Sequence, residues 1–518
     1  MRHTGLLLPL FSAASSHSWG IGELPDVAAL AAWAARCGCD RLMILPIGTM
    51  AAGHHSPYSA LSAMAIDPIF IAVERVPDFS QAGGTSTLGA RMRSELETAR
   101  AAAAVDYERV RSLKREALNR AFDYFVRQEW EQHTTRASTL ARYIARERWW
   151  LDDYALFQVL SAGHAGATWR EWPAPLRDRD PAALDSVRRQ HAREILQHQY
   201  LQWVAEGQWQ SARATAEGEG IAIFGDVPFV VNLHSADVWT RPDEFMLDVT
   251  VGTPPDAFSE TGQDWGLPAY RWDVEAARDY PWIRQRARRM AALFSGLRLD
   301  HVIGFYRTYN RPPDGEPFFM PDEEQAQLRQ GEAVVGIFKS TGALLIAEDL
   351  GTLPPFLRPS LDRLRVPGCK VLRWEREWDG PGQPFIEPAT FPSVSCVMTG
   401  THDTETLPDW WDHAGVEERS QLLRLPALAG RGFDPAQPWD DALRDALLEL
   451  AWTSGSDDLF AGVQDIFGWR DRINIPATVG DHNWRYRLPW PVDRLTDTPE
   501  AIDRAEFLQA LTGKLRAR

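Results

Sequence analysis

Short apolar runs alternate with stretches of helical periodicity along most of the chain. Near its start, a brief apolar strand from Gly5 to Pro9 is followed by a helix from about Pro25 to Arg36 and by a second apolar run from Arg41 to Ile47. A near-continuous apolar run is typical of a parallel strand that is covered on both faces. The order of strand, helix and strand therefore predicts a βαβ unit.

The pattern changes between residues 78 and 219, where long helical periodicity and many Ala, Arg, Glu and Gln residues occur. The stretch "LKREALNRAFDYFVRQEW" is one example, and its charges are typical of solvated helix faces. We interpret residues 78–219 as a mainly helical insertion between two parts of one catalytic barrel, residues 1–77 and 220–518. Whether the insertion contributes to a binding site or only packs against the barrel stays open, with packing as the favoured interpretation.

Strand-like runs resume after the insertion, separated in several places by helices such as the one predicted from Pro281 to Phe294. The runs cover residues 221–231, 297–300, 343–347, 370–373 and 395–399. Repeated strand and helix over this length favours a (β/α)8 TIM barrel, an α/β fold, over an open doubly wound sheet. The open sheet is the alternative, but no GxGxxG motif begins any of the helices.

Several of the predicted strands end in charged residues. These residues are Asp226 after "IAIFG", Arg298, Asp300 and His301 in "GLRLDH", Glu348 after "LLIA", and His402 and Asp403 after "CVMTGT". In a barrel of parallel strands the active site lies at the carboxyl ends of the strands. One such carboxylate would be a common helix cap, but four of them within otherwise apolar runs predict a shared site.

Arg298 and Asp300 are expected to point the same way, because alternate side chains of a strand share a face. A guanidinium beside a carboxylate holds it ionised and orients it, as a nucleophile requires. A structural ion pair at a strand end is the alternative. Several carboxylates without metal-ligand spacing indicate glycoside chemistry, in which one attacks and another donates a proton. Like charges in one pocket would keep Glu348 protonated while Arg298 keeps Asp300 ionised.

Composition narrows the class of partner. A net charge of -16 over 518 residues and a pI of about 5.3 argue against a nucleic acid or an anionic membrane and favour a neutral substrate. The 22 tryptophans suit stacking on sugar rings, although most are expected in the core. The four cysteines have no CxxC spacing and are expected to be buried thiols in a reducing compartment.

The start of the chain, "MRHTGLLLPLFSAASS", combines an arginine, an apolar run and small residues. It resembles a short signal peptide, but Pro9 interrupts its apolar run and cleavage would remove the first predicted strand. No window has the roughly eighteen consecutive apolar residues of a membrane span. We therefore expect a cytoplasmic protein.

Four segments, "GDVPFVV", "GLRLDH", "IAED" and "TGTHD", resemble the four sequence regions of the α-amylase clan. The flanking text, including "SWGIGEL", "GTPPDAFSETGQDWGLPAYRWD", "THDTETLPDWW" and "QDIFGWRDRINIPATVGDHNWRYRL", is similar to that of the amylomaltases, the 4-α-glucanotransferases of glycoside hydrolase family 77. The resemblance extends over nearly the whole chain outside the insertion.

The resemblance implies a set of site residues. Asp300 would be the nucleophile, Glu348 the general acid/base, and Asp403 the carboxylate that holds the donor sugar and stabilises the transition state. The implied substrate-binding residues are Ser56, Tyr58, Asp226, Gln263, Trp265, Arg298, His301 and His402. The segment from Gly252 to Ser259 matches the family's mobile loop over the acceptor sites. The family needs no metal or organic cofactor, so we interpret the pair His54 and His55 as loop residues.

The implied function is transfer of α-1,4-glucan segments or glucosyl units between maltooligosaccharides or glucans by a retaining double displacement. A retaining α-glucan hydrolase on the same fold is the alternative, and a non-catalytic glucan-binding protein is a further one. Some positions depart from the family text: Asp67 and Leu267 stand where Asn is usual, and "THDTET" and "TMAAGHHSPY" are altered. We expect them near the sugar-binding rim, so the acceptor preference stays open.

Overall fold

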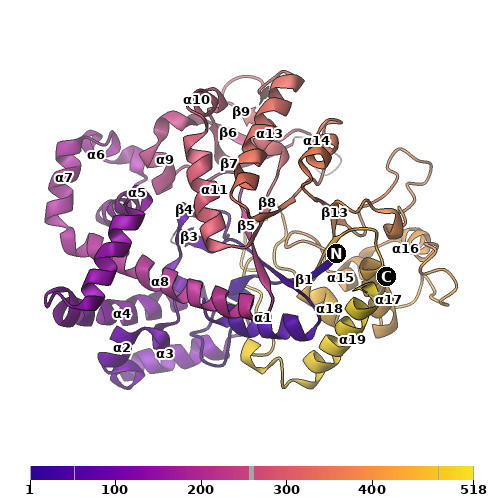
Figure 1. Ribbon diagram of the computed structural model, residues 1–518, viewed down its shortest axis with the longest axis horizontal. Coiled ribbons are helices and arrows are strands. Elements are labelled where there is room, and N and C mark those ends of the chain that lie inside the picture. Colours follow the sequence, from indigo (N-terminus) through magenta and orange to yellow (C-terminus); the bar gives the residue numbers. More distant parts are fainter. Residues whose placement is uncertain (1, 52, 256–261, 477, 517–518) are drawn as a thin grey trace.

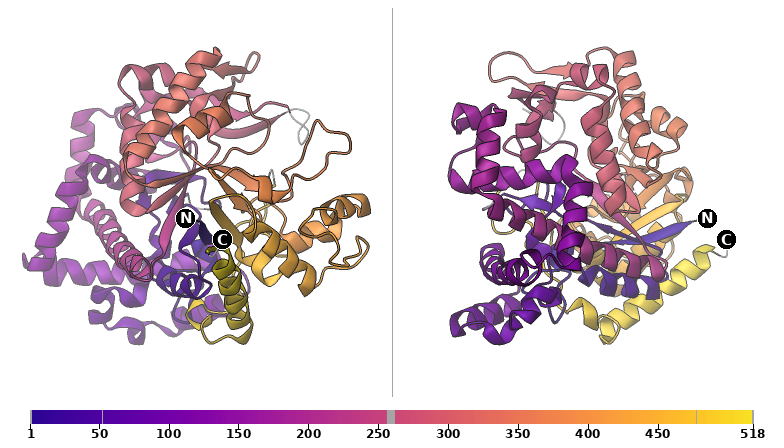
Figure 2. Two further views of the ribbon diagram at one scale, coloured as in Figure 1. Left: turned by 45° about the vertical axis from the view of Figure 1, so that its right-hand side comes forward. Right: turned by 60° about the vertical axis from the view of Figure 1, so that its left-hand side comes forward.

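Eight parallel strands close into a barrel in the order β1-β14-β13-β12-β11-β8-β5-β2. The structure is a computed structural model that describes residues 2–51, 53–255, 262–476 and 478–516. The barrel strands are β1 (His3–Leu7), β2 (Arg41–Ile44), β5 (Ala222–Val227), β8 (Gly296–Leu299), β11 (Leu344–Ala347), β12 (Gly368–Val371), β13 (Ser395–Met398) and β14 (Asp458–Gly462). The barrel lies at the centre of the molecule (Figures 1 and 2). The predicted (β/α)8 fold is confirmed.

Of the eight barrel strands, β14 is the one that the pattern does not predict. Its apolar run, Leu459 to Ala461, is short and follows Asp458, whose carboxylate is buried in an ion pair with Arg41 of β2. Inside the barrel the ring of Phe460 meets Phe224 of β5 edge to face, with ring centroids 5.4 Å apart. A Cβ at Gly5 would lie 2.5 Å from the Phe460 ring, so β1 needs a glycine there to make room for it.

Helices surround the barrel and bury its outer face. They include α1 (Asp26–Arg36), α11 (Pro281–Leu293), α13 (Glu324–Ser340), α14 (Leu357–Leu364), α15 (Leu407–His413), α16 (Val416–Leu423), α17 (Asp441–Trp452), α18 (Val463–Phe467) and α19 (Pro499–Arg516). Trp33 of α1 and Trp452 of α17 are buried and donate to α19, at Ala501 O (3.1 Å) and Thr512 Oγ1 (3.0 Å). The four cysteines are buried and free, as expected. None of the described helices is long and apolar enough to cross a membrane.

Two smaller sheets stand apart from the barrel. An antiparallel pair joins β3 (Gly48–Met50) to β4 (Ala60–Ile66). A four-stranded antiparallel sheet has the order β10-β9-β6-β7, with strands β6 (Phe245–Thr253), β7 (Gln263–Tyr270), β9 (Thr308–Arg311) and β10 (Phe318–Met320). The short helices near it are α9 (Ala236–Thr240), α10 (Trp272–Ala277) and α12 (Ile303–Tyr306).

Every element between Pro77 and Gly218 is helical. The helices are α2 (Pro77–Gln81), α3 (Ala90–Ala101), α4 (Tyr107–Phe125), the π-helix η5 (Val126–Trp130), α5 (Thr135–Gly163), α6 (Ala174–Arg177), α7 (Pro181–Gln190) and α8 (Ala192–Gly218), with short 3-10 turns η4 (Gly84–Thr87) and η6 (Trp169–Glu171). They form the purple side of the molecule in Figure 1. Because α8 also packs against α1 of the barrel, the division at residues 78 and 219 stays a prediction.

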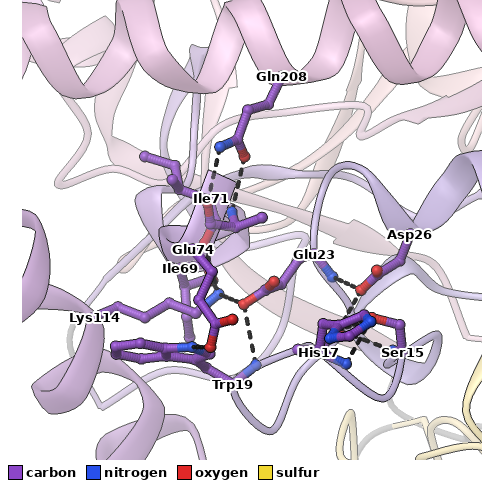
Figure 3. A network of polar contacts seen from close by, with 12 residues as sticks. Ser15, His17, Trp19, Glu23, Asp26, Ile69, Ile71, Glu74, Lys114 and Gln208 are labelled. Atoms are coloured by element: carbon purple, nitrogen blue, oxygen red, sulfur yellow. Dashed lines mark hydrogen bonds and ion pairs between the residues drawn. The ribbon is translucent and has the colours of Figure 1, made fainter. Parts of the chain in front are cut away.

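A buried ion pair ties the insertion to the loop that follows β1 (Figure 3). Lys114 of α4 places its Nζ 2.7 Å from Glu23 Oε1 and donates to the carbonyls of Ile69 and Ile71 at 2.6 and 2.9 Å. Glu23 also accepts from the amide of Trp19 at 3.1 Å. Burial raises the pKa of Glu23 to about 7, although Lys114 opposes this rise. These residues of the "SWGIGEL" segment therefore support the fold.

Asp67 does not lie at an open rim. Its side chain is fully buried. It accepts hydrogen bonds from both terminal nitrogens of Arg111, at 3.1 and 2.9 Å, and from the amides of Met50 and Ile69, at 2.9 Å each. The expectation of a place beside the sugar was wrong for this residue. An Asp suits this position because the guanidinium of Arg111 pairs with both of its carboxyl oxygens.

Candidate active site

The predicted charged residues gather at the carboxyl end of the barrel. Asp226 lies in β5, Arg298 lies in β8, and Asp300 directly follows β8. Glu348 directly follows β11, which pairs with β8 on the side opposite β5. Asp403 follows β13, two places further round the barrel. The rule that barrel strands deliver a site at their carboxyl ends therefore places these residues correctly.

Arg298 joins two of the carboxylates. Its Nη1 donates to Asp226 Oδ2 at 2.6 Å and to Asp300 Oδ1 at 2.8 Å, so Arg298 and Asp300 do point the same way. Burial by itself lowers the pKa of Arg298, but Asp226 and Asp300 raise it well above its usual value, and the arginine stays cationic. The Asp300 side chain is 24% exposed, whereas that of Asp226 is fully enclosed. Asp300 is therefore the one that a ligand can reach.

Asp226 is a buried acceptor that Arg298 and Tyr58 share. The Tyr58 hydroxyl donates to Asp226 Oδ2 at 2.8 Å, on the same oxygen that Arg298 contacts. Burial raises the pKa of Asp226, and Arg298 opposes the rise. Direct sugar binding by Asp226 stays a prediction that its burial does not favour, because its observed contacts are with Arg298 and Tyr58.

Glu348 is held by backbone amides. It accepts from the amide of His301 at 2.7 Å and from that of Leu350 at 3.0 Å. His301 has a φ of 45°, a strained left-handed conformation for a residue other than glycine, and its amide contacts Glu348. Burial raises the pKa of Glu348 to about 7, with a further increase from Asp300 and opposition from Arg298. Burial, more than like charge, makes this carboxyl able to carry a proton near neutral pH.

Asp403 has the opposite electrostatic setting. His402 Nε2 lies 3.3 Å from Asp403 Oδ2, and Asn474 Nδ2 donates to Asp403 Oδ1 at 2.6 Å. Burial by itself raises the pKa of Asp403, but His402 and Asn474 outweigh it and lower the pKa to about 2. Arg472 donates to the Asp403 carbonyl at 3.1 Å. Asp403 is thus ionised at neutral pH, and its side chain is 43% exposed.

Aromatic rings gather beside these carboxylates. The rings of Tyr58 and His402 stack with centroids 5.0 Å apart and planes 21° apart. The ring of Trp484 lies 5.8 Å from each of them. Ser56 Oγ accepts from the Tyr58 amide at 3.3 Å, in the connection between β3 and β4. Stacked apolar faces next to hydrogen-bonding groups are what a sugar ring requires.

β7 brings a second pair of predicted residues to the site. Trp265 meets His301 edge to face with centroids 4.8 Å apart, and its Nε1 donates to Gln263 Oε1 at 3.1 Å. Burial lowers the pKa of His301 to about 4, so its ring is neutral. Of the loop predicted from Gly252 to Ser259, residues 256–259 lie outside the described residues.

The remaining predicted histidines are on a loop. His54 is exposed, and His55 stacks on Tyr107 with centroids 4.7 Å apart and planes 13° apart. Within the described ranges, no group of three or more His, Cys, Asp or Glu side chains is placed to hold a metal ion.

Sequence reasoning missed three residues of the site. Asn474 and Arg472 contact Asp403, and Trp484 completes the aromatic group. All three fall within "QDIFGWRDRINIPATVGDHNWRYRL", a stretch that is informative for the family resemblance. The usable signal was Asn474 in "RINIP", a polar residue between two isoleucines.

A closed parallel barrel that brings a proton-carrying carboxyl next to an arginine-held carboxylate defines a glycoside-active barrel enzyme. A match to a known family makes this assignment more specific. The family model for 4-alpha-glucanotransferase, glycoside hydrolase family 77, matches residues 8–493, and the chain belongs to this family.

Curated relatives and solved structures agree with the family. The 4-alpha-glucanotransferase of Thermus thermophilus is 35% identical over 467 residues, which cover 86% of each chain. That of Synechocystis is 31% identical and covers 94% of each chain. The solved amylomaltase from Streptococcus agalactiae, in complex with acarbose, is 24% identical with a TM-score of 0.82, covers 100% of this chain and 99% of its own, and supports the fold. The chain is a 4-α-glucanotransferase of the amylomaltase type.

Proposed function

We propose that this 4-α-glucanotransferase moves α-1,4-linked glucan segments or glucosyl units between maltooligosaccharides or glucans by a retaining double displacement. Asp300 is the nucleophile, Glu348 is the general acid/base, and Asp403 stabilises the transition state. One observation carries the proposal. β8 and the residues after it hold both reacting groups, since Arg298 fixes one oxygen of Asp300 and the amide of His301 contacts Glu348.

In the first step, Asp300 attacks the anomeric carbon of the donor. Arg298 contacts Oδ1, which leaves Oδ2 to form the bond. Glu348 gives its proton to the leaving glycosidic oxygen, and the bond between that oxygen and the anomeric carbon breaks. The products of this step are a glucosyl ester on Asp300, an ionised Glu348 and a free glucan with a new 4-hydroxyl.

In the second step, the acceptor resolves the ester. Ionised Glu348 takes the proton of an acceptor 4-hydroxyl, whose oxygen attacks the anomeric carbon and releases the Asp300 carboxylate. Glu348 thereby regains its proton. Two inversions at one carbon retain the α configuration.

The other residues hold the sugars. The pair of His402 and ionised Asp403 accepts and donates hydrogen bonds to hydroxyls of the donor sugar, and Tyr58 lies against its face. Trp265 and Gln263 contribute on the acceptor side, and Ser56 fixes the turn before Tyr58. Neither a nucleic acid nor a membrane is part of this proposal, and a cytoplasmic location stays a prediction.

Transfer competes with hydrolysis at the ester on Asp300. Water is abundant, so transfer requires an acceptor that is bound with a high effective concentration in a site that limits water. The aromatic residues Tyr58, Trp484 and Trp265 suit this requirement because their faces bind sugar rings.

Incubation with maltotriose tests the proposed function. A ladder of longer maltooligosaccharides together with glucose is the expected result. Glucose and maltose alone would indicate a hydrolase, and unchanged maltotriose would indicate a binding protein, so either outcome would overturn the proposal. Asp300→Asn is the matched control, because it keeps the size of the side chain and removes the nucleophile.

A further inference from the structure

We propose that the helical insertion serves the donor-sugar site through one contact, and that Tyr107 is a positioning residue that acts through Trp484. This inference rests on the proposed function and extends it. It also addresses the question whether the insertion only packs against the barrel.

The contact joins the first residue of α4 to the aromatic group of the site. The Tyr107 hydroxyl donates to the carbonyl of Trp484 at 2.8 Å. Tyr107 is 1% exposed, so this hydroxyl has little access to water. Breaking a buried hydrogen bond costs more free energy than breaking an exposed one, because water cannot replace the lost partner. The contact therefore restrains the position of the Trp484 backbone.

Further hydrogen bonds run along the same seam. The Val105 amide donates to the carbonyl of Arg485 at 2.9 Å, and Arg485 Nε donates back to the Val105 carbonyl at 2.8 Å. Arg487 Nη1 donates to the carbonyls of Ala99 and Ala102 at 3.1 and 2.9 Å. The insertion therefore holds Trp484 and the residues after it through both backbone and side chains.

Trp484 needs such support because its backbone is strained. Its φ is 63°, a left-handed conformation that a bulky residue rarely adopts. Its amide donates to the carbonyl of Ile473 at 2.7 Å, and the next residue, Asn474, contacts Asp403. The Trp484 peptide is thus fixed on one side by the chain that carries Asn474 and on the other by Tyr107.

Tyr107 also contacts the loop that carries Tyr58. Its ring stacks on His55, which stands directly before Ser56 and close to Tyr58 in the chain. The two stretches that carry Tyr58 and Trp484 therefore share one support from the insertion. Side chains held within a narrow range of positions before the sugar arrives raise the rate, because less ordering remains to be done.

A double-mutant cycle tests the inference. Tyr107→Phe keeps the ring and its stack on His55 but removes the hydroxyl, and it is made both in the native chain and in a Trp484→Ala chain. With maltotriose, we expect kcat/KM for transfer to fall about fivefold in the native chain, the fold-change that one neutral hydrogen bond supplies. In the Trp484→Ala chain the same change should alter kcat/KM less than about twofold, because the group through which Tyr107 acts is gone.

Tyr124→Phe is the control. Tyr124 lies on the same helix, and no hydrogen bond of its hydroxyl is found within the part of the chain that the structure describes, so its removal should leave kcat/KM unchanged. If Tyr107→Phe fails to fold, Arg485→Gln is used in the same cycle, since it removes the Nε contact to Val105.

Two outcomes overturn the positioning role. An equal loss of kcat/KM in both backgrounds would mean that Tyr107 acts independently of Trp484. No loss of kcat/KM in the native chain would mean that Tyr107 has no positioning role, and a lower melting temperature of that variant would then show that it only supports folding. Failure of the wild-type protein to transfer would contradict the proposed function instead, so the two failures are distinguishable.

Discussion

Asn474 provides the sharpest test of the electrostatics around Asp403. Its Nδ2 donates to Asp403 Oδ1 at 2.6 Å, and the residue is 8% exposed. A hydrogen bond from a neutral donor to a charged group contributes about 1.5 to 3 kcal/mol. At about 1.4 kcal/mol for each factor of ten in rate, Asn474→Ala should lower kcat/KM for maltotriose about ten- to a hundredfold, because Asp403 loses both orientation and stabilisation of its charge.

The assay measures initial rates of transfer at pH 7 together with the melting temperature of each variant. Asn119→Ala, a change of the same type at an exposed position of α4, serves as the control and should keep the native rate. Asn474→Asp should be more harmful than Asn474→Ala at neutral pH, since it places a second negative charge beside Asp403 and raises the pKa of the pair. Activity of Asn474→Ala within twofold of the native value would refute the role given to this contact.

Three further predictions concern Glu348, Lys114 and Glu23. Because Glu348 must be protonated to act as an acid and its pKa is raised to about 7, kcat/KM should fall as the pH rises through about 7; a constant value between pH 6 and pH 9 would contradict the assignment. Lys114→Met should lower the free energy of unfolding by about 3 to 5 kcal/mol, because it leaves Glu23 buried without its partner, and should change kcat/KM little. Urea unfolding measures the change in stability. Without Lys114 the raised pKa of Glu23 rises further, so the loss of stability should be larger at pH 8 than at pH 5. Glu23→Gln in the Lys114→Met chain should restore part of the lost stability.

Much of the barrel and its catalytic carboxylates could be predicted from local rules. Side-chain alternation along "GLRLD" puts Arg298 and Asp300 on one face, and the barrel geometry brings Glu348 and Asp403 to the same end. These features depend on the regular repeat of strands, which the apolar pattern reveals. The apolar pattern did not predict β14, because Asp458, which pairs with Arg41, stands at its start in place of an apolar residue.

The parts that could not be predicted depend on irregular backbone and distant contacts. Trp484 lies beside Tyr58 and His402 with a φ of 63°, a backbone conformation that no periodicity reveals. Tyr107 lies more than three hundred residues earlier, and its hydrogen bond to Trp484 exists only in the folded chain. Asp67 was misplaced for the same reason, because its partner Arg111 belongs to the insertion. Local sequence patterns do not report such pairings.

The central claim is that Asp300 forms the covalent intermediate, and trapping that intermediate tests it most directly. Glu348→Gln is incubated with α-maltosyl fluoride, whose fluoride leaves without a proton, so the first step proceeds whereas the second lacks its base. Mass spectrometry of the digested protein should then show a maltosyl group on the peptide that contains Asp300, at Asp300 itself. Release of fluoride without any adduct, or an adduct on Asp226 or Asp403, would contradict the account.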